Sequence, residues 1–141
     1  MPRRILVVDD SPTMRSLHSY YLREAGFETV EADNGFTALE ALGRGACDLA
    51  LVDVNMPGMD GLTLTRCLRA DERTVTLPVI LCTTLVKEAD RRAGVAAGAN
   101  AYITKPPDAA ALLATIERVL ASDDWDAHST DAAKIAGGPD V

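Results

Sequence analysis

Five short apolar runs alternate with five segments of helical pattern along the first 121 residues of this 141-residue chain. Parallel strands need long crossover connections, so this alternation favours a parallel sheet with helices on both faces. The expected strands span residues 5–8, 27–32, 49–53, 79–83 and 101–104. Right-handed crossovers would join the whole run into one doubly wound α/β domain.

Capping residues and glycines set the expected helix bounds. Ser11-Pro12 is typical of a helix start, because proline in the first turn loses no hydrogen bond. Gly26 and Gly98 fit left-handed residues that end helices, and Asp108 fits an N-cap. The helices are expected over residues 12–25, 36–42, 60–70, 87–97 and 109–121.

Several residue types predict structure rather than chemistry. Met14, Leu17 and Tyr21 recur at helical spacing and predict the core-facing side of the first helix. His18 and His128 stand alone, so both are expected to be structural. An odd number of widely spaced cysteines predicts neither a disulfide framework nor a zinc site; they are Cys47, Cys67 and Cys82.

Length and charge limit the functions that the chain can have. The 141 residues suffice for one domain, which is expected over residues 1–121. Residues 122–141 are acidic and polar, which predicts a flexible tail that contains Trp125. Fourteen basic and 21 acidic residues give a net charge of −7, which disfavours direct binding to nucleic acid. No apolar stretch is long enough for a signal peptide or a membrane span, so we expect a cytoplasmic protein without membrane insertion.

Charged residues stand where three of the expected strands end. Asp9 and Asp10 follow the first strand, Asp53 ends the third, and Lys105 follows the fifth. The carboxyl ends of parallel strands share one edge of the sheet, where ligands bind. Three carboxylates at one point would repel one another unless a divalent cation lay among them, and Mg²⁺ prefers such oxygen ligands. The Asp-Asp-Ser-Pro segment alone is also ordinary turn and cap chemistry.

A carboxylate can also accept a phosphoryl group, in a reaction that depends on positioning and on neutralising the phosphoryl oxygens. Lys105 is the candidate cation, and Thr83, at the end of the fourth strand, is the candidate hydroxyl. No glycine-rich dinucleotide or P-loop motif occurs. The pattern therefore predicts magnesium and phosphate chemistry without nucleotide binding.

The chain resembles a response-regulator receiver domain of two-component signalling over about residues 3–121. The resemblance implies a flavodoxin-like fold with strand order 2-1-3-4-5. It rests on four motifs in order: Val7-Val8-Asp9-Asp10-Ser11, the segment from Leu51 to Gly61, Cys82-Thr83-Thr84, and the segment from Gly98 to Pro106.

The resemblance implies roles for the charged residues. Asp53 would be phosphorylated, and Asp9, Asp10 and Asp53 would hold Mg²⁺ together with the backbone carbonyl of Asn55. Lys105 would contact the phosphoryl group.

The resemblance also implies a switch. Thr83 would turn toward the phosphate and Tyr102 would swing inward behind it, which couples a local charge to a surface change. A cis bond is expected between Lys105 and Pro106.

The resemblance implies a stand-alone, monomeric regulator that accelerates only its own phosphorylation and dephosphorylation. The donor would be a sensor histidine kinase or a histidine phosphotransfer protein. The face formed by the fourth helix, fifth strand and fifth helix would bind a protein target, such as a flagellar motor switch in chemotaxis, or a kinase.

Departures from the family pattern qualify this interpretation. Thr84 stands where a smaller residue is usual, and Pro107 replaces a bulky apolar residue, which could alter the start of the last helix. Leu85 is apolar near the approach to Asp53, so the phosphate lifetime cannot be carried over. Gly58 and Gly61 are expected to supply permissive backbone angles in the loop after Asp53.

Three other functions stay open at this point. An aspartyl-nucleophile phosphatase would need substrate-binding insertions, which do not fit in this length. A flavodoxin-like cofactor binder would need a phosphate-cradling first loop, which Asp9-Asp10-Ser11-Pro12 does not provide. A receiver fold retained only for docking would not need its charged motif positions, yet all are present.

Overall fold

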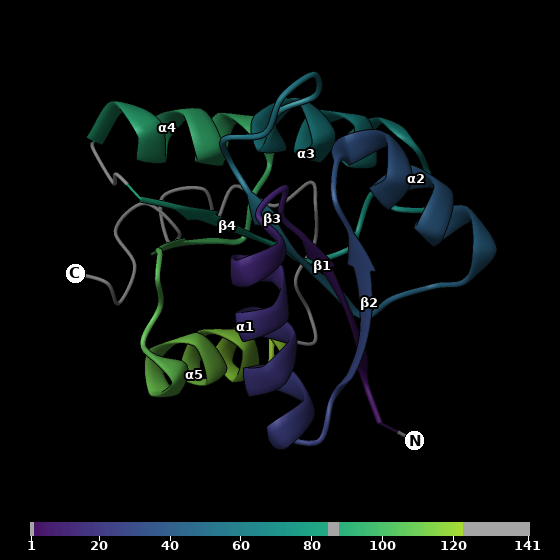
Figure 1. Ribbon diagram of the computed structural model, residues 1–141. Coiled ribbons are helices and arrows are strands. Elements are labelled where there is room, and N and C mark those ends of the chain that lie inside the picture. Colours follow the sequence, from purple (N-terminus) through teal and green to yellow (C-terminus); the bar gives the residue numbers. More distant parts are fainter. Residues whose placement is uncertain (1, 85–87, 123–141) are drawn as a thin grey trace.

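The computed structural model describes residues 2–84 and 88–122, and its arrangement is drawn in Figure 1. Leu85, Trp125 and His128 lie outside the described residues, so the predictions for them are not tested. The same holds for the predicted tail over residues 122–141, of which only Ser122 is described. The strands are β1 (Arg4–Val8), β2 (Glu28–Ala32), β3 (Leu49–Asp53), β4 (Val79–Thr83) and β5 (Ala101–Thr104). The helices are α1 (Pro12–Glu24), α2 (Gly35–Arg44), α3 (Gly61–Ala70), α4 (Glu88–Ala97) and α5 (Ala109–Leu120).

The five strands form one parallel sheet in the order β2-β1-β3-β4-β5, which confirms the predicted fold. Helices α1 and α5 cover one face, and α2, α3 and α4 cover the other (Figure 1). Successive residues of β1 serve the two sides in turn, because side chains alternate along a strand: Ile5 and Val7 pack with α1 and α5, while Leu6 and Val8 pack with α2 and α3. Burial on both faces explains why the sequences of β1, β3 and β4 are apolar runs rather than alternating patterns.

The register of the sheet brings the strand ends to one edge. Val8 pairs with Val52, so Asp9 follows immediately beside Asp53. On the other side Asp53 pairs with Cys82, one residue before Thr83. Thr83 in turn pairs with Thr104, which precedes Lys105. The main-chain ladder alone therefore gathers the predicted site residues at this edge.

The helix starts follow the predicted capping. The Ser11 hydroxyl accepts a hydrogen bond from the Met14 amide at 3.3 Å, and Asp108 accepts one from the Ala111 amide at 3.1 Å. Gly26 and Gly98 have φ of +97° and +104°, as expected for glycines after a helix. Pro107 is buried ahead of the Asp108 cap, and α5 starts at Ala109 as predicted.

The prediction that Met14, Leu17 and Tyr21 pack in the core holds only for Tyr21, which packs against the core cluster under α1 and α5. Met14, Leu17 and Tyr21 are only partly buried, while His18, Ser19 and Leu22 are buried. The stripe that enters the core runs through His18 and Leu22, one helical turn apart, and the apolar spacing lies on its flank. Two polar atoms of this stripe, His18 Nε2 and Ser19 Oγ, are buried without a hydrogen-bond partner in the described part of the chain.

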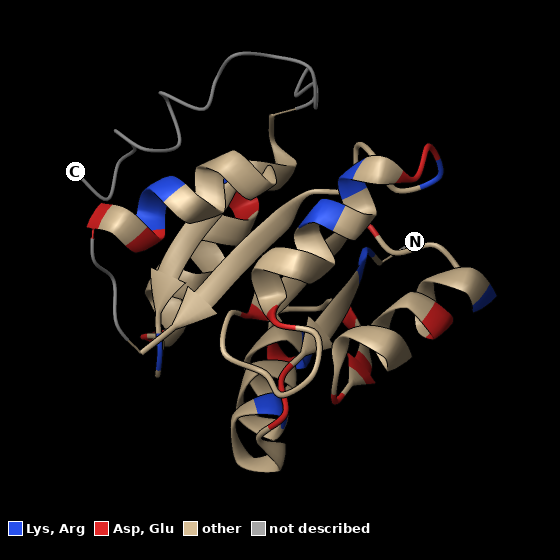
Figure 2. Cartoon of the chain, turned by 90° about the horizontal axis from the view of Figure 1, so that it is seen from above, with Lys and Arg blue, Asp and Glu red and all other residues tan. Residues whose placement is uncertain are grey.

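Charged residues of both signs are distributed over the described helices and loops. Figure 2 shows segments of both signs on several helices and loops. Among the described residues, no helix has the length and apolar character needed to cross a membrane.

Candidate functional site

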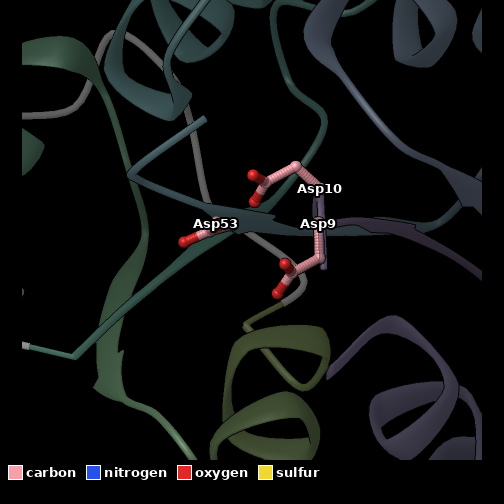
Figure 3. Close-up of side chains that lie close together, drawn as sticks. All are labelled: Asp9, Asp10 and Asp53. Carbon is pink, nitrogen blue, oxygen red and sulfur yellow. The ribbon is translucent and has the colours of Figure 1, made fainter. Parts of the chain in front are cut away.

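Three carboxylates converge at the carboxyl edge of the sheet. Asp9 and Asp10 follow β1 and Asp53 ends β3, and one oxygen of each lies within 4.8 Å of the others (Figure 3). Asp9 and Asp53 are 1% and 3% exposed, whereas Asp10 is exposed. The sequence prediction that these residues lie together is borne out by the geometry.

Lys105 lies between two of these carboxylates. Its Nζ is 3.2 Å from Asp9 Oδ2 and 3.2 Å from Asp53 Oδ1. Its backbone amide donates to the Thr83 carbonyl at 2.7 Å, and the peptide bond to Pro106 is cis, as expected. Burial lowers the pKa of Lys105, but the attraction of Asp53 and Asp9 outweighs this and leaves the pKa raised.

Asp53 is the electrostatically unusual member of the cluster. Burial, followed by repulsion from Asp9, raises its pKa from 3.8 to about 6, although Lys105 and the Asn55 amide favour the charged form. A divalent cation would reverse this balance by stabilising the carboxylate. A set of closely spaced carboxylate oxygens, one of them exposed to solvent, fits Mg²⁺, which takes a few carboxylates and keeps several waters.

The loop after β3 connects Asp53 to the end of β4. The Asn55 amide donates to Asp53 Oδ1 at 3.3 Å, and the Asn55 side-chain amide donates to Thr83 Oγ1 at 3.4 Å. Thr83 is 3% exposed. Asn55 therefore links the Thr83 hydroxyl to the Asp53 carboxylate through hydrogen bonds.

Tyr102 belongs to the neighbouring part of the sheet. It lies on β5, pairs with Leu81 of β4, and packs, half-buried, with the core cluster on the α3 side. Burial is the main reason why its pKa is raised. A Cβ at Gly94 of α4 would lie 3.0 Å from the Tyr102 ring, so this glycine leaves room for the ring.

The two glycines between Asp53 and the first turn of α3, Gly58 and Gly61, have different roles. Gly58 has φ of +80°, as predicted. The prediction for Gly61 was wrong, because its φ is not positive. A Cβ at Gly61 would overlap the Asp53 carbonyl oxygen and lie 2.9 Å from Val54 Cα. Gly61 is therefore required for close packing of α3 against the end of β3.

Sequence reasoning missed Arg15. Its Nη1 donates to the Asp9 backbone carbonyl at 2.7 Å, and its Nε donates to Glu31 Oε1 at 3.2 Å. The only signal in the sequence is a basic residue six positions after Asp9. That spacing does not reveal that the side chain turns back toward the strand end.

Comparisons with known proteins agree with this geometry. Residues 5–117 match the response regulator receiver domain. The chain is 44% identical to chemotaxis protein CheY of Pseudomonas aeruginosa over 118 residues, which cover 83% of this chain and 95% of that protein. It is 41% identical to protein PilH of the same organism, over 84% of this chain and 98% of that protein.

Solved structures are similar as well. Chemotaxis protein CheY4 of Vibrio cholerae matches with a TM-score of 0.82 and 32% identity, over 84% of this chain and 99% of that one. A sensor histidine kinase receiver domain from Pseudomonas aeruginosa, with a magnesium ion in its active-site cleft, matches with a TM-score of 0.80 and 30% identity, over 86% of this chain and 100% of that one. This chain belongs to the response-regulator receiver domain family.

Proposed function

We propose that this receiver accepts a phosphoryl group on Asp53, in a Mg²⁺-dependent reaction, from a histidine kinase or a histidine phosphotransfer protein. The observation that carries the proposal is the placement of Asp53 Oδ1 3.2 Å from Lys105 Nζ, within the cluster of three carboxylates. A nucleophile, a cation and metal-binding oxygens are the groups that phosphoryl transfer to a carboxylate requires.

The carboxylates of Asp9, Asp10 and Asp53 would hold the metal, and the backbone carbonyl of Asn55 is proposed as a further ligand. When bound, Mg²⁺ neutralises charge on the phosphoryl oxygens and on the acceptor carboxylate. A pKa of about 6 leaves Asp53 largely ionised at neutral pH, so the nucleophile is available.

In the transfer step an Asp53 carboxylate oxygen attacks phosphorus as the bond to the donor histidine nitrogen breaks. The electron pair of that bond stays on the imidazole, and Asp53 becomes an acyl phosphate. Lys105 would exchange part of its contact with Asp53 for a phosphoryl oxygen. A compact ammonium on a flexible stem suits this exchange.

The signal would then pass to the α4-β5-α5 face. Thr83 would leave Asn55 and donate its hydroxyl to a phosphoryl oxygen, and Tyr102 would move inward against α4. The contact between Asn55 and Thr83 at 3.4 Å supports this proposal because it is long for a hydrogen bond and easily exchanged. A protein target that prefers the rearranged face would read the change.

Acetyl phosphate tests the chemistry without a kinase. Incubation with acetyl phosphate and Mg²⁺ should add the mass of one phosphoryl group, and Asp53→Asn should abolish the addition. Asp33→Asn is the matched control, because Asp33 is an exposed carboxylate beyond the end of β2 at the same edge. Modification of the Asp53→Asn variant would place the acceptor elsewhere, and steady hydrolysis of varied phosphomonoesters would favour a phosphatase.

A further inference from the structure

Arg15 bridges three elements next to the acidic cluster. It lies in the first turns of α1, and its guanidinium donates to the Asp9 carbonyl after β1 at 2.7 Å and to Glu31 on β2 at 3.2 Å. Its side chain is 20% exposed. Glu31 Oε2 also lies 3.9 Å from Nη1 of Arg23, whose side chain is 55% exposed. Arg23 follows Arg15 by about two turns of α1.

The carbonyl that Arg15 holds belongs to the peptide unit between Asp9 and Asp10. Because a peptide unit is planar, fixing its carbonyl oxygen also fixes the direction in which the chain enters Asp10. Arg15 is rigid at this point, since its planar guanidinium is oriented at a second nitrogen by Glu31. Asp10 is exposed, so packing does not orient its carboxylate.

Other contacts hold the Asp9 side of the turn. The Asp9 amide donates to the Ala32 carbonyl at 3.1 Å, and Asp9 Oδ1 accepts from the Ser11 amide at 2.9 Å. Lys105 contacts the other carboxylate oxygen of Asp9. Asp9 is thus fixed by several neighbours, and its bond to the Ser11 amide also closes the turn around Asp10. Arg15 is the side chain that holds the carbonyl of the peptide leading to Asp10.

We infer that Arg15 is a positioning residue for the metal site: it orients the Asp9–Asp10 peptide so that the Asp10 carboxylate points toward Asp53. The inference rests on the proposed use of these carboxylates as Mg²⁺ ligands. Glu31 orients the guanidinium in turn, which extends the site from β1 to the edge strand β2. Residues that orient metal ligands typically contribute 10–100-fold to metal affinity.

The direction in which Arg15→Met changes the Mg²⁺ affinity distinguishes a positioning role from a purely electrostatic one. A cation near the carboxylates repels Mg²⁺, so if Arg15 acted only through its charge, Arg15→Met would tighten Mg²⁺ binding. If Arg15 acts by orienting Asp10, the same substitution weakens binding, by about tenfold.

Calorimetric titration of the full chain with MgCl₂ provides the measurement. Arg15→Met should weaken binding about tenfold, and Arg15→Lys, which keeps the charge but cannot hold both partners in a planar fork, should weaken it severalfold. Arg23→Met is the matched control, because it removes a cation near Glu31 without touching Asp9. Its Mg²⁺ affinity should equal that of the wild type or be slightly higher.

The outcomes distinguish this inference from the proposed function. Unchanged or tighter Mg²⁺ binding by Arg15→Met overturns the positioning role, provided that the variant unfolds in urea with the same cooperative transition as the wild type. If Arg15→Met does not fold, wild-type affinity in Arg15→Lys overturns it instead. Wild-type protein that binds no Mg²⁺ would overturn the metal site itself.

Discussion

Replacing Asp53 by asparagine is expected to make the metal-free protein more stable at neutral pH. Asparagine has the shape of the protonated carboxyl and carries no charge. In the folded protein, burial and the nearby Asp9 carboxylate disfavour the ionised form of Asp53 and raise its pKa from 3.8 to about 6. At 1.36 kcal/mol per pKa unit this corresponds to about 3 kcal/mol of stability lost on ionisation.

The pH dependence follows from the direction of the shift. The folded protein binds the Asp53 proton more tightly than the unfolded chain does. The stability from Asp53 is therefore complete below pH 3.8 and is lost as the pH rises through about 6. The variant should match the wild type near pH 4 and exceed it by about 3 kcal/mol at pH 7.5.

His18 shifts in the opposite direction and must be separated from Asp53. Burial is the main cause of its lowered pKa, so its contribution is present above pH 6.5 and is lost as the pH falls below that value. Both proteins contain His18, so the difference between their unfolding free energies removes this contribution.

Urea unfolding in EDTA, at a series of pH values from 4 to 7.5, measures the difference directly. Added Mg²⁺ should reduce it, because the metal stabilises the ionised carboxylates of the wild type. A wild type that is more stable than Asp53→Asn at pH 7.5 in EDTA would refute the electrostatic reasoning, as would a difference that does not change with pH.

Substitutions at Lys105, Gly61 and Gly94 test other contacts. Lys105→Met removes the cation between Asp9 and Asp53, so it should raise the pKa of Asp53 above 6, which NMR titration of the carboxyl group would measure. It should also destabilise the metal-free protein by about 3 kcal/mol in urea unfolding. Lys105→Arg keeps the charge but should slow modification by acetyl phosphate. Gly61→Ala should lower the unfolding free energy by about 3 kcal/mol, because the added Cβ meets the Asp53 main chain. Its control is Gly43→Ala, which has open space around it in α2 and should raise the unfolding free energy by up to about 1 kcal/mol. Equal effects of the two variants in urea unfolding would contradict the steric role of Gly61. Gly94→Ala should displace the Tyr102 ring and shift its ¹⁹F signal in protein labelled with 3-fluorotyrosine, while the signals of Tyr20 and Tyr21 stay in place.

The sequence predicted the fold and the convergence of the charged residues for a common physical reason. Apolar runs mark buried strands, parallel strands end at one edge, and Asp9, Asp53 and Lys105 stand where the runs end. Caps such as Ser11 and Asp108 were recognisable because they act on residues only three positions away.

What the sequence did not predict depends on contacts between elements. The core-facing side of α1 could not be read from Met14 and Leu17, because the rotation of a helix on a sheet decides which stripe is buried, and here it buries His18. Gly61 looked like a residue needed for its backbone angles, and only the proximity of Asp53 reveals its steric role. The backward reach of Arg15 to Asp9 depends on the turn between β1 and α1.

Chemical mapping of the residue that acetyl phosphate modifies tests the central claim most directly. Protein treated with acetyl phosphate and Mg²⁺ is reduced with borohydride, which converts an aspartyl phosphate to homoserine, and its peptides are then sequenced by mass spectrometry. Homoserine at position 53, dependent on Mg²⁺ and lost in EDTA, is the predicted result. Homoserine at another aspartate, or a stable phosphoester on a serine or threonine, would contradict the assignment of Asp53 as the acceptor.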